Sequence, residues 1–232
     1  MQRVIPIESP SFISEEKLQQ AGNPALLFAE PRPLAMEIGC GTGDFIIQMA
    51  RQRPDLNFLA IDIYNKGCLK TCRKIDEHRL ANVRVLRMEA RYLLTRFLEP
   101  ETLQALYINC PDPWPKKRHQ QRRLVNRDFL DLVGHFLAPQ GEFVFCTDFA
   151  DYARQVAELF PLPGFDNCLG EASASHLEGY PFSKYMRKFR ESGLPLHFIH
   201  HRKSTHFHGN RIAGSAYPMN VDLRTTGHGG AP

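Results

Sequence analysis

The sequence predicts an α/β fold in which a mostly parallel sheet is covered by helices on both faces. From Leu34 onward, short apolar runs alternate with amphipathic segments of helical period. A glycine-rich turn at residues 39–43 follows the first run. Acidic residues stand at the ends of several runs, where open sheets of this kind bind their ligands. Together these observations indicate a Rossmann-like, doubly wound sheet with right-handed crossovers.

The expected strands are the short apolar runs, and the expected helices are the amphipathic segments between them. The strands are 34–38, 58–61, 83–86, 105–110 and 141–146. The helices are 44–53, 66–80, 92–98, 128–137 and 152–160. A late strand at Leu196–His200 is expected to run antiparallel to the others.

The chain divides into three parts. Residues 1–33 are expected to form an N-terminal extension, in which Ser14 caps a short helix. Residues 34–203 are expected to form the single α/β domain. Residues 204–232 are rich in glycine and lack periodicity, so we expect them to be disordered.

Composition narrows the class of protein. A chain of 232 residues with 43% hydrophobic content can bury one α/β core. No run approaches the roughly 18 apolar residues of a membrane span, and the N-terminus lacks the apolar core of a secretory signal. The six cysteines form no Cys-x-x-Cys pair and are expected to be buried free thiols. A cytoplasmic protein without an obligate protein partner is predicted.

Positive charge is concentrated in one segment, here called the basic tract. The net charge is +4, but the rest of the chain is slightly acidic without the tract. Its six cations, with no acid among them, are Lys116, Lys117, Arg118, Arg122, Arg123 and Arg127. A solvated helical face would explain such a run, but its freedom from acids favours nucleic acid as the partner.

The glycine turn has the form Gly39-x-Gly41-x-Gly43, and Glu37 precedes it by two positions. Glycines permit a tight turn and a close approach of ligand to backbone. A dinucleotide-binding turn would read Gly-x-Gly-x-x-Gly. The observed spacing resembles the first motif of Rossmann-like S-adenosylmethionine methyltransferases.

Two further acids follow the next two strands. Asp62 closes the second strand, where its carboxylate can accept hydrogen bonds from ribose hydroxyls. Glu89 follows the third strand, where such enzymes contact adenine. The alternative is a structural glycine turn with incidental acids nearby.

After the fourth strand, Asp112 lies between Pro111 and Pro113 and is followed by Trp114 and the basic tract. Proline fixes φ and donates no backbone hydrogen bond, so Asp112 sits on a stiff turn. A carboxylate held there beside cations indicates chemistry on an anionic substrate. Trp114 has two interpretations: stacking on a base, or packing within the turn.

These motifs together resemble the tRNA (guanine-N7-)-methyltransferase family over Leu34–Leu196. The resemblance rests on the glycine turn, on Pro-Asp-Pro-Trp-Pro-Lys-Lys-Arg-His at 111–119, on Thr147-Asp148, and on 183–189 followed by Gly-Leu-Pro. It implies a class I methyltransferase fold, S-adenosylmethionine as cofactor and tRNA as substrate.

The resemblance also implies site residues. Implied for the cofactor are Glu37, Gly39, Gly41, Gly43, Asp62, Glu89 and Asp112, with Asp112 as the catalytic residue. Implied for the substrate are Lys116, Arg118, His119, Arg122, Arg123, Asp148, Ser183, Tyr185 and Met186. In the family, 183–186 reads Thr-x-Tyr/Phe-Glu. Met186 replaces that glutamate and cannot accept a hydrogen bond from guanine as it would.

The chemistry is compatible with a carboxylate that is not a base. Guanine N7 carries a free lone pair at neutral pH, so no proton has to be removed before attack. The methylated ring is cationic, so Asp112 suits electrostatic stabilisation and orientation better than proton abstraction. Asp148 has two compatible interpretations, namely substrate contact and capping of the next helix.

Other functions remain as alternatives. Methyltransferases that act on DNA or on exocyclic amines have Asp/Asn-Pro-Pro-Tyr/Phe after the fourth strand, and Asp112-Pro113-Trp114 lacks the second proline. A non-catalytic tRNA-binding protein is a second alternative. No metal site is expected. The histidines at 197, 200, 201, 206 and 208 lack a ligand spacing and are expected at the surface, whereas Cys68 and Cys72 are expected in the core.

Overall fold

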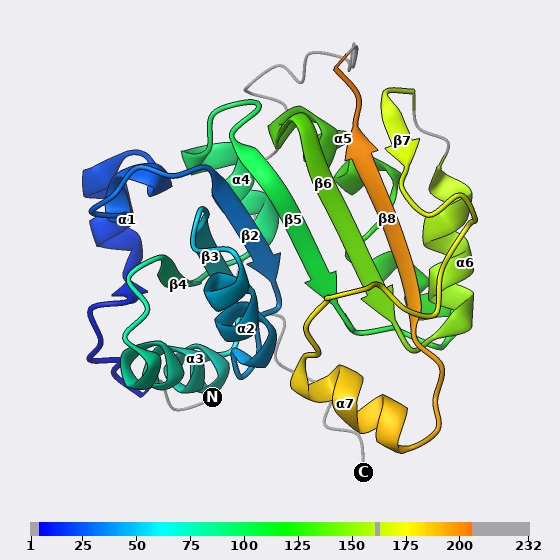
Figure 1. Ribbon diagram of the computed structural model, residues 1–232, viewed down its shortest axis with the longest axis horizontal. Helices are drawn as coiled ribbons and strands as arrows, with labels where there is room; N and C mark the ends of the chain where they lie inside the picture. The colour runs from blue at the N-terminus through cyan, green and yellow to red at the C-terminus, as the bar shows by residue number, and fades with distance from the viewer. Residues whose placement is uncertain (1–4, 161–162, 206–232) are drawn as a thin grey trace.

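The computed structural model describes residues 5–160 and 163–205, and these form one mixed sheet (Figure 1). The strands of this described part follow the spatial order β1-β4-β3-β2-β5-β6-β8-β7. Their bounds are β1 Phe12–Ile13, β2 Leu34–Ile38, β3 Asn57–Asp62, β4 Val83–Arg87, β5 Leu103–Asn109, β6 Leu137–Thr147, β7 Phe165–Asn167 and β8 His197–Lys203.

Strands β1 to β6 pair in parallel, and β8 runs antiparallel to both β6 and β7. The mostly parallel sheet and its late antiparallel strand are therefore confirmed. β2 lies between β3 and β5, so the chain order reverses on either side of it. Ligands of doubly wound sheets bind at such a reversal, beyond the carboxyl ends of the strands.

The N-terminal segment is more closely integrated than its sequence indicates. Phe12 and Ile13 pair with Val85 and Leu86, so β1 extends the sheet beyond β4. As predicted, Ser14 caps the helix that follows, because its side chain accepts a hydrogen bond from the Lys17 amide. The expected C-terminal tail lies outside the described residues from residue 206 onward.

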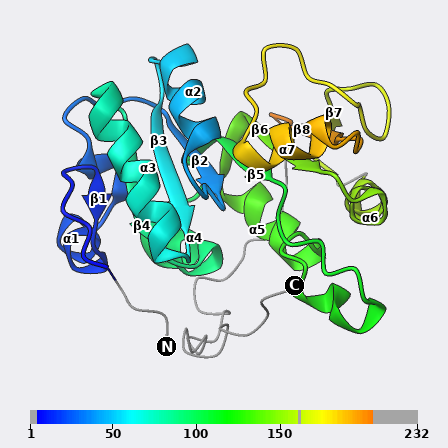
Figure 2. The same cartoon turned by 90° about the horizontal axis from the view of Figure 1, so that it is seen from below.

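Helices cover both faces of the sheet (Figure 2). Two short 3-10 helices, η1 (Pro24–Leu27) and η2 (Lys117–Arg122), accompany seven α-helices within the described residues. The α-helices are α1 Glu15–Ala21, α2 Asp44–Gln52, α3 Asn65–His78, α4 Ala90–Phe97, α5 Arg127–Phe136, α6 Ala150–Leu159 and α7 Lys184–Glu191. Buried side chains of α2 and α3 form one core cluster with β3, and those of α4, α5 and α6 form another on the opposite face.

The cysteine expectations hold only in part. Cys68 and Cys72 are buried in the α2–α3 core as expected. Cys168 is exposed and Cys110 is half-buried, because both lie in connections beyond strand ends. The expectation that all six thiols are buried is therefore wrong.

The histidine expectation is also wrong for one strand residue. His201 is 5% exposed and stacks on Phe160 at 3.6 Å between ring centroids. Burial lowers the pKa of His201 to about 4, which keeps the ring neutral. His206 and His208 lie outside the described residues. In the part of the chain that the structure describes, no cluster of three or more His, Cys, Asp or Glu could hold a metal ion. No helix of that part is long and apolar enough to cross a membrane.

Candidate active site

The predicted acids lie at or just after the carboxyl ends of parallel strands. Parallel strands bring these ends to one edge of the sheet (Figure 1). Glu37 is in β2 and Asp62 closes β3, while Glu89, Asp112 and Asp148 follow β4, β5 and β6. The predicted acids therefore converge on the edge where the chain order reverses.

The glycine turn is fixed by steric contacts with α3. All three of its glycines have positive φ, between 55° and 79°. A Cβ on Gly43 would lie 2.8 Å from the side chain of Thr71. A Cβ on Gly67 would lie 2.7 Å from the carbonyl oxygen of Gly41, so a fourth glycine is needed to leave room for the turn. Gly67 lies inside a helical segment, and nothing in its local sequence indicates this contact.

Asp62 links the end of β3 to the glycine turn. One carboxylate oxygen accepts a hydrogen bond from the Gly41 amide at 2.8 Å, and the other accepts one from the Tyr64 amide at 2.8 Å. Burial raises the pKa of Asp62, and the amides of Tyr64, Gly41 and Ile63 act against that rise. The carboxylate still keeps lone-pair capacity that can accept a hydrogen bond from a ligand.

Glu37 is almost completely buried, with 1% exposure. Its Oε1 accepts a hydrogen bond from Asn109 Nδ2 at 3.2 Å, whereas Oε2 has no partner among the described residues. Burial raises the pKa of Glu37 to about 8. An unpaired buried oxygen is unfavourable unless a ligand supplies the missing donor.

Two residues that the sequence interpretation missed hold Glu37 in place. Asn109 ends β5, and its Oδ1 accepts a hydrogen bond from the Tyr180 hydroxyl at 2.8 Å. This bond fixes which side of the Asn109 amide faces Glu37. The local signal was a polar residue at the end of an otherwise apolar strand. Tyr180 lies far along the chain, and only the fold brings it here.

Glu89 has a structural task besides any ligand contact. It is the N-cap of α4, where its side chain accepts a hydrogen bond from the Tyr92 amide at 2.9 Å. The carboxylate is half-buried at the edge of the site.

The turn that carries Asp112 is strained and anchored, while Asp112 itself is exposed. Cys110 and Trp114, on either side of it, have φ values of 48° and 44°, a left-handed conformation that side chains disfavour. The Cys110 amide donates to the Cys146 carbonyl at 2.8 Å, and Arg123 Nε donates to the Pro113 carbonyl at 2.8 Å.

Arg123 is an internal anchor of this turn. It is 2% exposed, pairs with Asp151 at 2.9 Å and donates a hydrogen bond to Gln155. Its guanidinium also lies 4.7 Å from the centre of the Tyr152 ring. The expectation that Arg123 contacts tRNA needs correction, because every strong contact of its side chain points into the protein.

The remaining cations of the basic tract have a different environment. Lys116, Lys117, Arg118, Arg122 and Arg127 are exposed, and His119 is half-buried. The Arg122 guanidinium lies 5.0 Å from the centre of the Trp114 ring, and the His119 ring meets the tryptophan edge to face. Trp114 therefore packs within the tract, which supports the second of its two interpretations.

Asp148 is half-buried, and burial raises its pKa. It does not cap α6. Phe149 occupies the N-cap position without a side-chain cap bond, and its amide donates to Thr147 Oγ1 at 3.2 Å. The capping interpretation is therefore wrong.

Residues 183–186 begin α7. The Ser183 hydroxyl accepts a hydrogen bond from the Met186 amide at 3.2 Å, and the Ser183 amide approaches the Met186 sulfur at 3.4 Å. Met186 is fully buried with Cys146, Leu196 and Phe198, so it serves packing and capping and not substrate contact. Tyr185 is 55% exposed.

Comparisons with known proteins agree with this geometry. The family model described as "Putative methyltransferase" matches residues 31–199. The tRNA (guanine-N(7)-)-methyltransferase of Syntrophotalea carbinolica is 54% identical over 204 residues, which is 88% of each chain. That of Geobacter metallireducens is 48% identical over 206 residues, covering 88% of this chain and 98% of the relative.

Solved structures share the fold. The 16S rRNA methyltransferase KamB superposes with a TM-score of 0.56 at 12% identity, covering 88% of this chain and 97% of that one. A structure titled as an antibiotic-related methyltransferase gives a TM-score of 0.54 at 16% identity, covering 88% of this chain and 98% of that one. The expected fold of the class I methyltransferase type is thus confirmed.

Proposed function

The chain belongs to the tRNA (guanine-N7-)-methyltransferase family, and we propose that it transfers the methyl group of S-adenosylmethionine to N7 of the variable-loop guanine of tRNA. One observation carries this proposal: the exposed carboxylate of Asp112 lies on the turn that leads into the basic tract, and its charge acts on Asp62, which accepts a hydrogen bond from the glycine turn. A donor site, a charged group and an RNA surface therefore adjoin one another at a single sheet edge.

The donor set fits the cofactor. The unpaired Oε2 of Glu37 suits the ammonium of the methionine part, and Asp62 keeps lone pairs for ribose hydroxyls. Glu89 lies where adenine contact is expected, and the turn of Gly39, Gly41 and Gly43 allows close approach of the ligand. When bound, S-adenosylmethionine supplies an electrophilic methyl group.

Asp112 acts as electrostatic stabiliser and orienter. Guanine N7 attacks with its own lone pair, so no base is required, and positive charge develops on the ring. A carboxylate that is already fixed in place stabilises that charge without reorganising. Alignment of the reacting atoms can contribute up to about 7–11 kcal/mol. The anchored turn around Asp112 supplies such alignment.

The exposed cations bind the tRNA. Lys116, Arg118 and Arg122 contact phosphates. His119 belongs to the same surface, where its ring packs against Trp114. The target base has to leave its stack before it can react. Because Met186 is buried, recognition of the guanine edge rests on Asp148 and Asp112, and Ser183 and Tyr185 add further substrate contacts.

A single assay separates the alternatives. The protein is incubated with tritiated S-adenosylmethionine and bulk tRNA, and the labelled nucleoside is identified. Label in 7-methylguanine supports the proposal. Label in DNA or in an exocyclic amine would support the first alternative. Thermal stabilisation by the cofactor without any methyl transfer to nucleic acid would indicate a non-catalytic tRNA-binding protein.

A further inference from the structure

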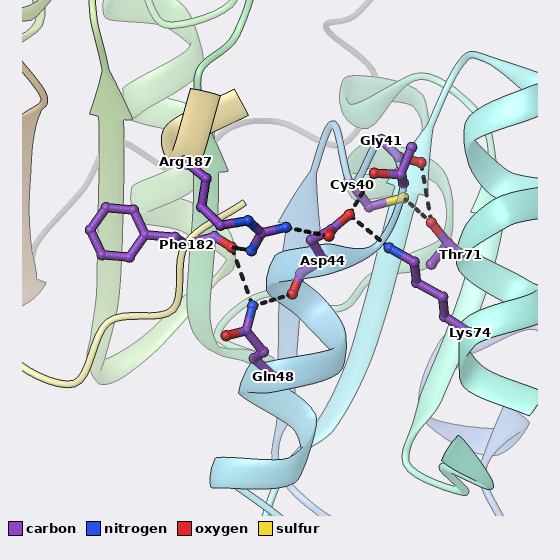
Figure 3. Close-up of polar contacts among 9 residues, drawn as sticks. Cys40, Gly41, Asp44, Gln48, Thr71, Lys74, Phe182 and Arg187 are labelled. Atoms are coloured by element: carbon purple, nitrogen blue, oxygen red, sulfur yellow. Dashed lines mark hydrogen bonds and ion pairs between the residues drawn. The ribbon is translucent and has the colours of Figure 1, made fainter. Parts of the chain in front are cut away.

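One carboxylate joins three separate segments near the glycine turn (Figure 3). Asp44 is the first residue of α2, directly after the turn, and its side chain is 17% exposed. Its Oδ1 accepts a hydrogen bond from Arg187 of α7. Its Oδ2 accepts hydrogen bonds from Lys74 of α3 at 2.8 Å and from Thr42 at 2.6 Å. Burial acts to raise the pKa of Asp44, but these partners lower it, so the carboxylate stays charged.

A backbone carbonyl at the start of α7 completes the connection (Figure 3). The Phe182 oxygen accepts hydrogen bonds from Arg187 Nη1 at 2.8 Å and from Gln48 Nε2 at 3.2 Å. Gln48 Nε2 also donates to the Asp44 carbonyl at 2.6 Å. The segment that leads into Ser183 is therefore bonded to α2, the helix that directly follows the glycine turn.

The other attachment of α7 is apolar. Met186, the residue before Arg187, packs in a core cluster with Cys146, Leu196 and Phe198. Apolar packing holds α7 against the core but is not directional, whereas the charged hydrogen bonds of Arg187 fix the orientation of the helix. Arg187 thus supplies the charged hydrogen bonds that join α7 to the residue following the glycine turn.

We propose that Arg187 and Asp44 are positioning residues that couple occupancy of the cofactor site to the placement of Ser183 and Tyr185 beside the guanine. This inference rests on the proposed function and adds a link between its two binding sites. A cofactor bound at the glycine turn contacts the segment that leads directly into Asp44. The bond from Asp44 to Arg187 transmits that contact to α7, so tRNA binds more tightly when the cofactor site is occupied.

The test measures the coupling directly. The affinity of an unmodified tRNA transcript is measured with and without saturating S-adenosylhomocysteine, for the wild type, Arg187→Gln and Lys74→Gln. Lys74 is the matched control, because it is a second cation on the same carboxylate but belongs to α3. By linkage, tRNA must change the affinity for S-adenosylhomocysteine by the same factor, which provides an internal check.

In the wild type, S-adenosylhomocysteine should tighten tRNA binding at least about fivefold. Arg187→Gln should bring this factor close to one, while its affinity for S-adenosylhomocysteine in the absence of tRNA stays within about twofold of the wild-type value. Lys74→Gln should keep the wild-type coupling factor. Asp44→Asn, which leaves α7 unaltered, should behave like Arg187→Gln and covers the case in which the arginine variant fails to fold.

Three results would overturn the inference: no coupling in the wild type, undiminished coupling in Arg187→Gln, or equal loss in Lys74→Gln. A purely structural role would lower thermal stability in these variants and leave the coupling factor unchanged. Failure of the proposed function would be seen separately, as a wild type that forms no 7-methylguanine.

Discussion

Replacing Arg123 with alanine should destabilise the fold without weakening the electrostatic attraction to tRNA. The side chain is 1% exposed and has three polar partners, the Pro113 carbonyl, Asp151 and Gln155. Breaking a buried charged pair typically costs about 3–5 kcal/mol. Asp151 is 40% exposed and keeps Arg154, so it can be hydrated after the loss. We therefore expect the free energy of unfolding to fall by about 3 kcal/mol, the lower end of this range.

For a chain of this length, that loss lowers the melting temperature by about 6–12 °C. Urea denaturation of Arg123→Ala gives the free energy of unfolding, and tRNA affinity at several salt concentrations gives the number of phosphate contacts. Arg122→Ala is the control, since Arg122 is the exposed neighbour. It should reduce the salt slope by about 0.7–0.9 and barely alter stability. A loss below about 1 kcal/mol in Arg123→Ala, or a salt slope reduced as in Arg122→Ala, would refute the anchoring role.

Three further predictions concern the acids and α7. Asp112→Asn should lower turnover by about 100-fold or more while tRNA affinity changes little, and near-normal turnover would contradict the electrostatic role. The folded-state pKa of Glu37 is raised from 4.5 to about 8, so its stability contribution is fully present below pH 4.5 and is lost as the pH rises towards 8. Denaturation of the cofactor-free protein across that range should show the decline, and Glu37→Gln should flatten it; an equal slope in both proteins would exclude Glu37 as its source. Met186→Ala should lower the free energy of unfolding, measured by urea denaturation, by about 2–3 kcal/mol, because it leaves a cavity in the core. Almost no loss would show that Met186 is exposed and not buried.

The positions of the acids could be predicted because parallel strands share an edge. A carboxylate at the end of an apolar run in such a sheet lies at the carboxyl edge, so the positions of Glu37, Asp62 and Asp112 could be predicted from the alternating pattern. The glycine turn was interpreted through the resemblance of its spacing to the first motif of S-adenosylmethionine methyltransferases. These inferences needed only local sequence and the handedness of crossovers.

The orientation of neighbouring side chains could not be predicted in this way. Arg122 and Arg123 are adjacent and chemically identical, and only the arrival of α6 with Asp151 decides which one is buried. β1 has two residues, too few to show periodicity. The bond from Arg187 to Asp44 spans 143 positions and leaves no trace in local composition.

The left-handed backbone at Cys110 and Trp114 has a consequence for how this protein tolerates change. Each such residue costs about 1–2 kcal/mol, which glycine would avoid. Heat selection of a mutant library without an activity screen should therefore enrich glycine at these two sites. The selected variants would be more thermostable, but their Asp112 would no longer be held in one position. Thermal stability and methyl transfer therefore make opposing demands on one short turn.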